Sequence, residues 1–389
     1  MDKMKKLALM LPAMRLGGAE KIALNFIDDL KKHFDITLIL NEKEGVLLPF
    51  VPDGVKVLED KLWHFGRIVR YDVKHFKLIS LFKDLVYYLR IKRTKRKEKN
   101  YRYLVQRTPK ITEKFDVAIS YVANVSTQIF SLEGRIDADK KIAWIHGETT
   151  ELKDVKLFSK IYQKFDNIFA VSGVTKEHFI KKFPLLTAKT DVYYNPINAE
   201  KILRGATEKV GEVFDDKVTD IFSIGRVTPE KGFDMMPGIV STLKEKGYKV
   251  KWYLVGDGTM VDKIKLKAER LGVSDEVVLL GAKANPYPYL SRCDIYVQPS
   301  YEEGYSTTIC EAGILGKAII GTSSSGGIRE QIVDGVSGII AEPTVESLAE
   351  KIAYLIDNPE KRIELETNVK KVDFAHERQI EKLLNVVGE

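Results

Sequence analysis

The segment Cys293–Glu311 (CDIYVQPSYEEGYSTTICE) decides the fold. Its apolar start, Cys293–Val297, predicts a buried strand, and the pattern from Thr308 to Leu315 predicts a helix. Glu303 therefore lies in the loop where the strand ends, and Glu311 lies about one turn into the helix. The first N–H groups of a helix lack partners within it and attract anions. The segment thus predicts a cradle for an anionic, hydroxyl-rich ligand such as a sugar nucleotide.

The same order of strand and helix recurs along the whole chain. A length of 389 residues exceeds one ordinary core and suits two α/β domains. Alternation of apolar runs with helical patterns indicates parallel sheets. We expect strands at 7–11, 35–40, 116–121, 141–145 and 167–171, and then at 220–223, 251–255, 277–280, 295–298, 318–321 and 338–340.

The domain boundaries follow from this alternation. We expect a first Rossmann-like domain over 1–197 with a basic helical insertion over about 64–107. A second such domain spans 198–372, entered through the polar stretch 200–218, and a terminal helix in 373–389 packs back on the first domain. The fold class is therefore α/β, with two facing doubly wound domains. Ligands of such domains bind at the carboxyl ends of the strands, so we expect the site in a cleft between the domains.

Composition narrows the class of protein. The chain is 44% hydrophobic, and its mean hydropathy is −0.17. No apolar run is long enough to span a bilayer. Cys293 and Cys310 form no disulfide or zinc framework and suit a reducing cytoplasm.

Two cations lie close together in Ser223–Gly232 (SIGRVTPEKG), which follows the first strand of the second domain. Arg226 and Lys231 are five positions apart on a loop that enters a helix. A departing diphosphate needs such cations, since Arg binds phosphate with a two-pronged fork and Lys acts as a point charge. The alternative is a surface turn with ordinary charges.

Other candidate residues also follow strand ends. Gly17 and Gly18 open the first helix, where glycine lets backbone approach a phosphate, although a plain turn explains them equally well. His146 comes just after the strand 141–145 and is either a site residue or a structural histidine. Gly256 and Lys283 stand in turns after the next two strands of the second domain.

Several segments in order resemble one family. The motif from Glu303 to Glu311, the stretch Gly316–Thr322 and the stretch Gly326–Glu330 resemble the C-terminal signature of the retaining family 4 glycosyltransferases, which have the GT-B fold. The resemblance implies transfer of a hexosyl unit from a nucleoside diphosphate sugar to an acceptor hydroxyl with retention of configuration. Of the two common bases we expect UDP rather than GDP. The resemblance also implies an E-x7-E motif and no catalytic cofactor.

The resemblance implies a role for each candidate. Glu303 takes the donor hexose and Glu311 the ribose, while Arg226 and Lys231 hold the diphosphate and His146 contacts the sugar near the reacting carbon. The backbone N–H groups of Gly304, Tyr305 and Ser306 are expected to meet hexose or phosphate, and Tyr305 and Ser306 depart mildly from the family pattern. The donor-side positions are completed by Gly17, Gly18, Gly225, Gly256 and Lys283. Asp137 and Asp139 imitate a metal motif in a predicted polar turn, so we expect no metal.

The net charge of +7 is concentrated in one segment. Arg90–Arg102 holds eight basic residues and one acid, Glu98, and follows apolar residues at helical spacing (Leu78, Leu81, Phe82, Leu85, Val86 and Leu89). We expect this segment to bring the protein to an anionic membrane surface by electrostatics, with the apolar positions committed to their own domain. A solvated face is the alternative; nucleic acid is disfavoured because no nucleic-acid motif accompanies the charges.

The sequence thus predicts a metal-independent hexosyltransferase, cytoplasmic and peripheral on the inner face of the plasma membrane. Its acceptor is expected to be a lipid-linked saccharide or another bacterial surface glycan. Two alternatives stay open: a non-catalytic partner subunit of another transferase, and a sugar-nucleotide epimerase of similar architecture. The acceptor, the donor sugar and the linkage do not follow from the sequence.

Overall fold

The computed structural model describes residues 4–15, 17–62, 65–93, 97–123, 126–147, 152–209, 214, 217–323, 326–375 and 379–388. The chain forms two compact units. The first comprises Met1–Val171, Thr175–Tyr193 and Arg378–Glu389, and the second comprises Ser172–Val174 and Tyr194–Glu377.

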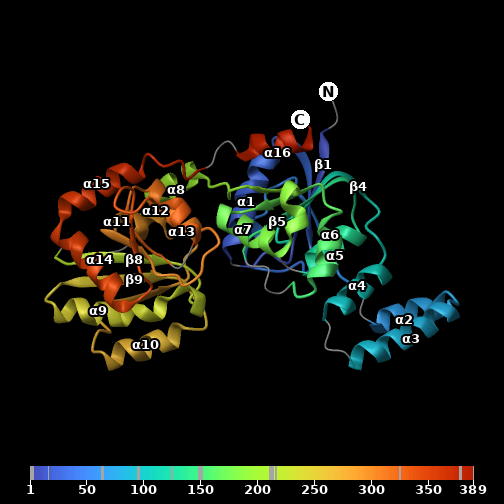
Figure 1. The fold of residues 1–389 in the computed structure, drawn as a ribbon, viewed down its shortest axis with the longest axis horizontal. Coiled ribbons are helices and arrows are strands. Elements are labelled where there is room, and N and C mark those ends of the chain that lie inside the picture. The colour runs from blue at the N-terminus through green and yellow to red at the C-terminus, as the bar shows by residue number, and fades with distance from the viewer. Residues whose placement is uncertain are drawn as a thin grey trace. The chain divides into compact units, whose positions relative to one another are not determined.

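The first unit is built on a parallel sheet of seven strands in the order β3-β2-β1-β4-β5-β6-β7, with helices on both sides (Figure 1). Its strands are β1 (Lys5–Leu11), β2 (Phe34–Leu40), β3 (Lys56–Glu59), β4 (Lys114–Ser120), β5 (Asp137–Ile145), β6 (Asn167–Ala170) and β7 (Thr190–Val192). The helices of this half are α1 (Gly18–Leu30), η1 (Leu48–Phe50), α2 (Phe65–Lys74), α3 (Leu78–Arg93), α4 (Lys97–Arg107), α5 (Ser126–Gly134), α6 (Val155–Tyr162), α7 (Gly173–Lys182) and η2 (Pro184–Lys189).

The second unit repeats this plan with six parallel strands in the order β10-β9-β8-β11-β12-β13. Its strands are β8 (Thr219–Ile224), β9 (Val250–Val255), β10 (Val277–Gly281), β11 (Ile295–Gln298), β12 (Ala318–Thr322) and β13 (Ile339–Ala341). Its helices are α8 (Ala199–Ala206), η3 (Pro229–Lys231), η4 (Phe233–Met235), α9 (Met236–Glu245), α10 (Val261–Arg270), α11 (Tyr287–Arg292), α12 (Thr307–Ile314), α13 (Gly326–Gln331), α14 (Val345–Asp357) and α15 (Pro359–Val369).

The strand order fixes where a ligand can bind. The order reverses next to the first strand of each sheet, between β1 and β4 and between β8 and β11. Because doubly wound sheets bind ligands at the carboxyl ends of strands beside this reversal, the loops after β8 and β11 are favoured positions. The two doubly wound sheets confirm the predicted fold class.

Buried apolar side chains on the strands anchor these loops. In the second unit Trp252, Ile295 and Val297 are fully buried within one hydrophobic cluster. In the first unit an aromatic cluster lies under the sheet's carboxyl edge, where the Trp144 ring is 5.2 Å from Phe26 and 4.5 Å from Tyr193, centroid to centroid. The strand ends are therefore held in place by packing on both sides of the sheets.

The last helix, α16 (Gln379–Val387), lies against the first sheet. Lys382 Nζ is 2.6 Å from Asp191 Oδ2, and Lys5 Nζ donates to the Gly388 carbonyl at 2.9 Å. Leu383 is fully buried. The terminal segment is thus fixed to the first unit by ion pairing, a hydrogen bond and burial.

The structure adds to or differs from several local predictions. The polar stretch 200–218, predicted as the entry to the second domain, contains most of α8, whose buried Ile202 gives it an apolar face. Asp137 and Asp139 stand in strand β5 rather than in a turn, and Lys114 Nζ pairs with Asp139 Oδ1 at 2.7 Å. The predicted basic segment falls on the end of α3 and on α4, and residues 94–96 lie outside the described residues.

Candidate functional site

The loops after β8 and β11 are joined by their backbones. Gly232 has φ +68°, and a Cβ there would lie 2.1 Å from the Pro299 carbonyl oxygen. The N–H groups of Tyr301 and Glu302 donate to the Glu230 carbonyl at 2.9 and 3.3 Å. Only glycine allows this approach, so the sequence Glu230–Gly232 holds the two loops together.

An ion pair lies where the loops meet. Lys231 Nζ is 2.5 Å from Glu303 Oε2, and the two side chains are only 16% and 12% exposed. Ser300 Oγ donates to the same carboxylate oxygen at 3.3 Å. The structure therefore brings together two residues that the sequence analysis placed on separate motifs, 72 positions apart.

A network of hydrogen bonds among buried polar side chains supports this ion pair. Gln298 Nε2 donates to Ser300 Oγ at 2.8 Å, and Gln298 Oε1 accepts from Tyr296 OH at 2.6 Å and from Thr308 Oγ1 at 2.9 Å. Such a connected network fixes side-chain positions in a low-dielectric interior. Sequence analysis gave Gln298 and Ser300 no role; the signal was a polar residue ending an otherwise apolar strand.

Arg226 occupies the outer part of the same loop. Its side chain is 63% exposed, and Nη2 lies 3.6 Å from Glu230 Oε1. Burial raises the pKa of Glu230, but the hydrogen bond from Thr228 and the charge of Arg226 outweigh burial and hold that pKa below its ordinary value. Glu230 thus stays ionised and orients a guanidinium that remains largely accessible to a ligand.

Glu311 has a tyrosine partner that the sequence analysis missed. Tyr287 OH donates to Glu311 Oε1 at 3.2 Å, and burial together with this carboxylate raises the pKa of Tyr287. The Tyr287 N–H is held by Asn285 Oδ1 at 3.1 Å. Lys283 lies half-buried in the same loop after β10. This loop therefore converges on the helix that carries Glu311.

The Ser306 backbone is already occupied. Its N–H donates to Gln331 Oε1 at 2.9 Å, and its carbonyl accepts from Gln331 Nε2 at 2.6 Å. Its hydroxyl caps α12 by accepting the Ile309 N–H at 3.4 Å. This donor is therefore paired with Gln331, and the predicted contact of the Ser306 N–H with a ligand stays a prediction.

Tyr305 and Gly304 are also tightly packed. Tyr305 is 7% exposed, and its ring centroid is 5.2 Å from that of Tyr194. A Cβ on Gly327 would lie 2.3 Å from the Gly304 carbonyl oxygen, so the start of α13 lies directly against this loop. Packing therefore fixes the backbone around Glu303 on both sides.

Gly225 and Gly256 serve close packing of strand ends. A Cβ on Gly256 would lie 1.8 Å from the Gly225 carbonyl oxygen, and the Gly256 N–H donates to the Gly281 carbonyl at 3.1 Å. This contact accounts for Gly256 without a ligand. The predicted contact of either glycine with the donor stays a prediction.

In the first unit, His146 follows β5 and is half-buried. Its Nε2 atom is buried and has no hydrogen-bond partner within the part of the chain that the structure describes. Burial lowers the pKa of His146 to about 3, so the imidazole is neutral at pH 7. Its ring lies 4.5 Å from Tyr121 and 5.6 Å from Trp144, centroid to centroid. The candidate residue of the first unit is thus a neutral histidine that packs on aromatic rings.

A carboxylate lies beside the glycine that precedes α1. Gly17 precedes the helix in an extended conformation, and no side chain caps the N-terminus. A Cβ on Gly17 would lie 2.2 Å from Glu20 Oε2. Because an anion favours a helix N-terminus, Glu20 competes with any phosphate for this end of α1, which begins at Gly18.

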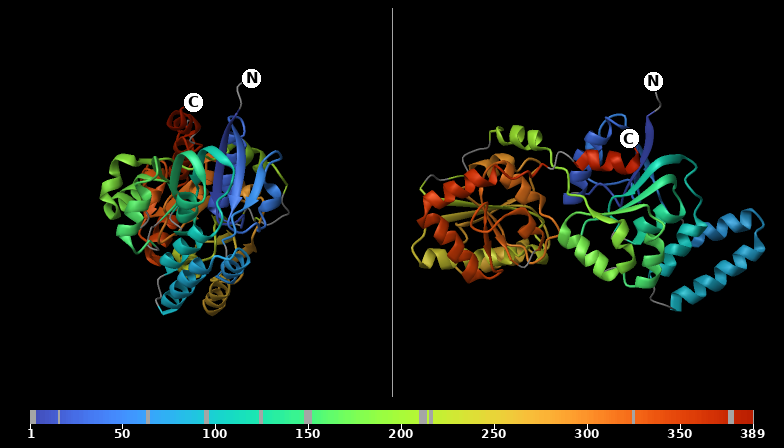
Figure 2. Two further views of the ribbon diagram at one scale, coloured as in Figure 1. Left: turned by 90° about the vertical axis from the view of Figure 1, so that its right-hand side faces the viewer. Right: turned by 45° about the horizontal axis from the view of Figure 1, so that its top comes forward.

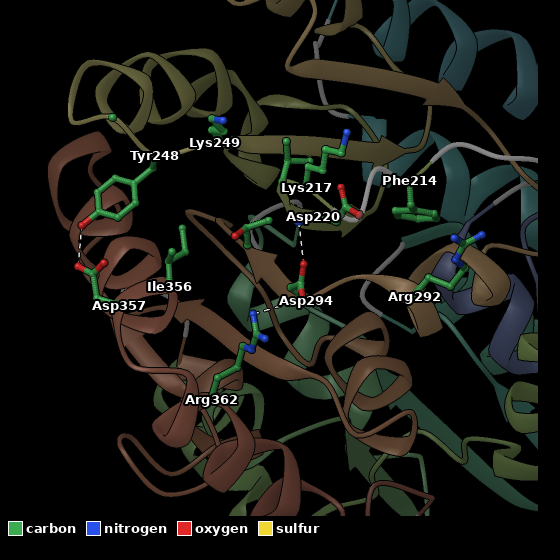
Figure 3. A pocket seen from close by; sticks show the side chains of 13 residues that line it. Phe214, Lys217, Asp220, Tyr248, Lys249, Arg292, Asp294, Ile356, Asp357 and Arg362 are labelled. Carbon is green, nitrogen blue, oxygen red and sulfur yellow. Dashed lines mark hydrogen bonds and ion pairs between the residues drawn. The ribbon is translucent and has the colours of Figure 1, made fainter.

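A surface pocket lies at the opposite, amino edge of the second sheet (Figure 3). It encloses about 610 Å³ and is lined by basic and acidic side chains. Several of these are paired, since Arg362 Nη1 is 3.2 Å from Asp294 Oδ1 and Tyr248 OH donates to Asp357 at 2.6 Å. The sequence analysis did not predict this pocket, and it lies away from the strand ends that carry Lys231 and Glu303.

Among the described residues, no group of three or more His, Cys, Asp or Glu side chains is arranged to hold a metal ion.

Comparison with known proteins identifies the region that holds these loops. Residues 206–372 match the family model described as Glycosyl transferases group 1. The matched region includes Arg226, Lys231, Glu303 and Glu311. His146 and the Gly17–Gly18 turn lie outside it.

Two curated relatives carry the likeness over different lengths. A Campylobacter jejuni N-acetylgalactosamine-N,N'-diacetylbacillosaminyl-diphospho-undecaprenol 4-alpha-N-acetylgalactosaminyltransferase is 24% identical over 87% of this chain and 86% of its own length. The N,N'-diacetylbacillosaminyl-diphospho-undecaprenol alpha-1,3-N-acetylgalactosaminyltransferase of the same organism is 31% identical over 42% of this chain and 43% of its own length. Both relatives are glycosyltransferases.

The fold is shared with solved structures. HepE from Anabaena, determined in complex with UDP and glucose, superposes with a TM-score of 0.72 at 17% identity, covering 98% of this chain and 99% of its own. The glycosyl transferases group 1 match and the two relatives agree with the function predicted from the sequence.

Proposed function

We propose that this protein is a retaining glycosyltransferase that moves a hexosyl unit from a nucleoside diphosphate sugar to an acceptor hydroxyl. The observation that carries the proposal is the Lys231–Glu303 ion pair at the carboxyl edge of the second sheet. It joins the loops beside the strand-order reversal, within the region that matches the glycosyl transferases group 1 model. A cation and a carboxylate held there suit a ligand that carries both phosphate and sugar hydroxyls.

Each residue then has a distinct task. Lys231, rigid and largely buried, supplies a fixed positive charge for the diphosphate, while the more exposed Arg226 closes on it as a two-pronged fork. Glu303 accepts hydrogen bonds from the donor hexose, and Glu311 accepts them from the ribose. Together the two glutamates form the E-x7-E motif, with Tyr287 orienting Glu311.

We propose a front-face reaction at this site. The glycosidic carbon–oxygen bond to the diphosphate breaks as the acceptor oxygen bonds the same face of the sugar, so configuration is retained. The acceptor's proton passes to the leaving diphosphate oxygen. Arg226 and Lys231 stabilise the negative charge that develops there, which makes a metal unnecessary. His146, neutral because it is buried, offers a hydrogen bond near the sugar without adding positive charge.

The proposed substrates are a UDP-hexose and a lipid-linked saccharide or other bacterial surface glycan. Both curated relatives bear names that specify undecaprenol diphosphate glycans as acceptors. We place the protein in the cytoplasm on the inner face of the plasma membrane, with Arg90–Arg102 contacting anionic lipid. The side chains of 90–99 lie outside the described residues. Within the described residues, no helix has the length and apolarity of a membrane-spanning segment.

A donor panel tests the proposal. UDP- and GDP-hexoses are incubated with the protein, with and without EDTA, and the released nucleotide is measured. The expected result is turnover of one donor, unchanged by EDTA, with the anomeric configuration of the transferred sugar retained by NMR. Inversion, or activity that EDTA abolishes and Mg²⁺ or Mn²⁺ restores, contradicts the mechanism, and no turnover of any donor contradicts the function.

A further inference from the structure

Helices α2, α3 and α4 form an arm of the first unit. The α2–α3 hairpin (blue to cyan) extends away from the sheet of its own unit in Figures 1 and 2. Arg107 on α4 fastens the arm by pairing with Asp72 of α2 and, at 2.8 Å, with Asp84 of α3. Tyr103 stacks on Tyr87 at 4.0 Å between ring centroids.

The inside of the arm holds buried ions beside the apolar side chain of Ile68, which is 1% exposed. Asp72 and Asp84 are 0% and 3% exposed, although each is a carboxylate. Burial and the Asp84 carboxylate raise the pKa of Tyr103, and Arg107 supplies the balancing positive charge. Hydrogen-bonded ions therefore help to hold the three helices together, so the arm does not depend on the apolar face of α3 for its packing.

One exposed face of α3 is apolar. Leu78, Phe82, Leu85 and Leu89 follow one another at steps of four, three and four residues, which places them on one face of α3. They are 70%, 69%, 49% and 55% exposed. Phe76, at the turn before α3, is 87% exposed. The prediction that the apolar positions of α3 pack on their own domain is therefore wrong for Leu78, Phe82, Leu85 and Leu89.

Every exposed charge around this stripe in the described part of α2 and α3 is positive. The acids of residues 65–93 are Asp72 and Asp84, and both are buried against Arg107. The exposed basic residues are Arg67, Arg70, Lys74, Lys77 and Lys83. An apolar stripe within a cationic rim matches a bilayer interface with anionic headgroups. It disfavours a second copy of the chain, because a twofold pairing sets the cationic rims against each other.

We propose that the stripe formed by Leu78, Phe82, Leu85 and Leu89 inserts into the surface of an anionic bilayer. The inference deepens the membrane contact of the proposed function and replaces a purely electrostatic attachment with hydrophobic insertion. The arm, rather than the whole unit, carries the attachment. Lys74, Lys77 and Lys83 select anionic headgroups, and the stripe supplies the part of the affinity that salt does not screen.

Vesicle co-sedimentation tests this inference on the full chain. Vesicles of phosphatidylcholine with and without phosphatidylglycerol are compared at low and high salt. We expect binding to phosphatidylglycerol vesicles that persists in part at high salt, and a loss of about tenfold or more in Phe82→Ser/Leu85→Ser. The control is Leu185→Ser/Leu266→Ser, which alters side chains that are 78% and 53% exposed but lie outside the arm.

A second probe reports insertion directly. Phe82→Trp should show a blue-shifted emission on vesicles and quenching by brominated acyl chains. Wild-type binding by Phe82→Ser/Leu85→Ser, or no shift in Phe82→Trp, overturns the inference. A third outcome also overturns it: size-exclusion chromatography shows that the wild type is a dimer and that Phe82→Ser/Leu85→Ser is a monomer, while vesicle binding is the same for both. Donor hydrolysis without vesicles should be unchanged in the stripe variant, so failure of the catalytic proposal is recognised separately.

Discussion

The Lys231–Glu303 ion pair allows a sharp test of the site. The two residues stabilise the fold as a pair, whereas in the proposed reaction Lys231 contacts the diphosphate and Glu303 contacts the hexose. In Lys231→Met, Glu303 keeps its place, 12% exposed, and loses its cation. Breaking a buried pair costs about 3–5 kcal/mol, and the residual exposure here reduces the expected cost to about 2–3 kcal/mol. The loss of a charged hydrogen bond to the leaving diphosphate adds about 2 kcal/mol to the barrier, or roughly 30-fold in kcat/KM.

The double variant Lys231→Met/Glu303→Gln separates these effects. It removes both charges, so much of the lost free energy of unfolding should return, while kcat/KM should stay at or below that of Lys231→Met. Stability is followed by urea unfolding of the full chain, and activity by release of nucleotide from the donor. The reasoning is refuted if Lys231→Met retains kcat/KM within about threefold of wild type, because such a change corresponds to less than about 1 kcal/mol in the activation free energy. Activity that returns together with stability also refutes it.

The remaining predictions address single residues. Glu311→Ala should weaken binding of the free nucleoside diphosphate more than Glu303→Ala does, as measured by calorimetry, and the reverse order would exchange their roles. Gly232→Ala should lower both stability and turnover more than Gly272→Ala, because both glycines have positive φ (68° and 64°) but only Gly232 faces a backbone oxygen at 2.1 Å. Burial lowers the pKa of His146 from 6.5 to about 3, so between these pH values the unfolded chain binds a proton at this residue and the folded chain does not. The free energy of unfolding should therefore fall as pH drops from 6.5 toward 3, by up to about 1.4 kcal/mol per pH unit. His146→Gln should flatten that slope in pH-dependent unfolding, and an unchanged slope would show that His146 is solvated.

Strand periodicity predicted the two sheets well, because parallel strands buried on both faces are continuous apolar runs. The strand β3 (Lys56–Glu59) was not predicted, because it is short, lies at the sheet edge and is only partly buried. The loops of the site were predicted from the strand ends, but the contact between the loop after β8 and the loop after β11 was not. Gly232 against Pro299 is a tertiary contact between segments that no local pattern relates.

The arm shows the limit of sequence patterns most clearly. Helical spacing identified the apolar face of α3 but not which way the face points. That direction depends on Arg107, which is 35 positions from Asp72 and 23 from Asp84. Because ion pairs at such separations leave no periodic signal, the apolar stripe was assigned to the core when it lies on the surface.

The most direct test of the central claim, that the carboxyl edge of the second sheet binds a diphosphate, is calorimetry that compares UDP with uridine and GDP with guanosine. Wild type should bind one diphosphate at least about tenfold more tightly than its nucleoside, since charged hydrogen bonds contribute about 1.5–3 kcal/mol each. Arg226→Gln should lose most of that difference and leave nucleoside binding unchanged, while Arg270→Gln, an exposed arginine at the end of α10, should behave as wild type. Equal affinity of wild type for diphosphate and nucleoside, or undiminished diphosphate binding by Arg226→Gln, would contradict the account.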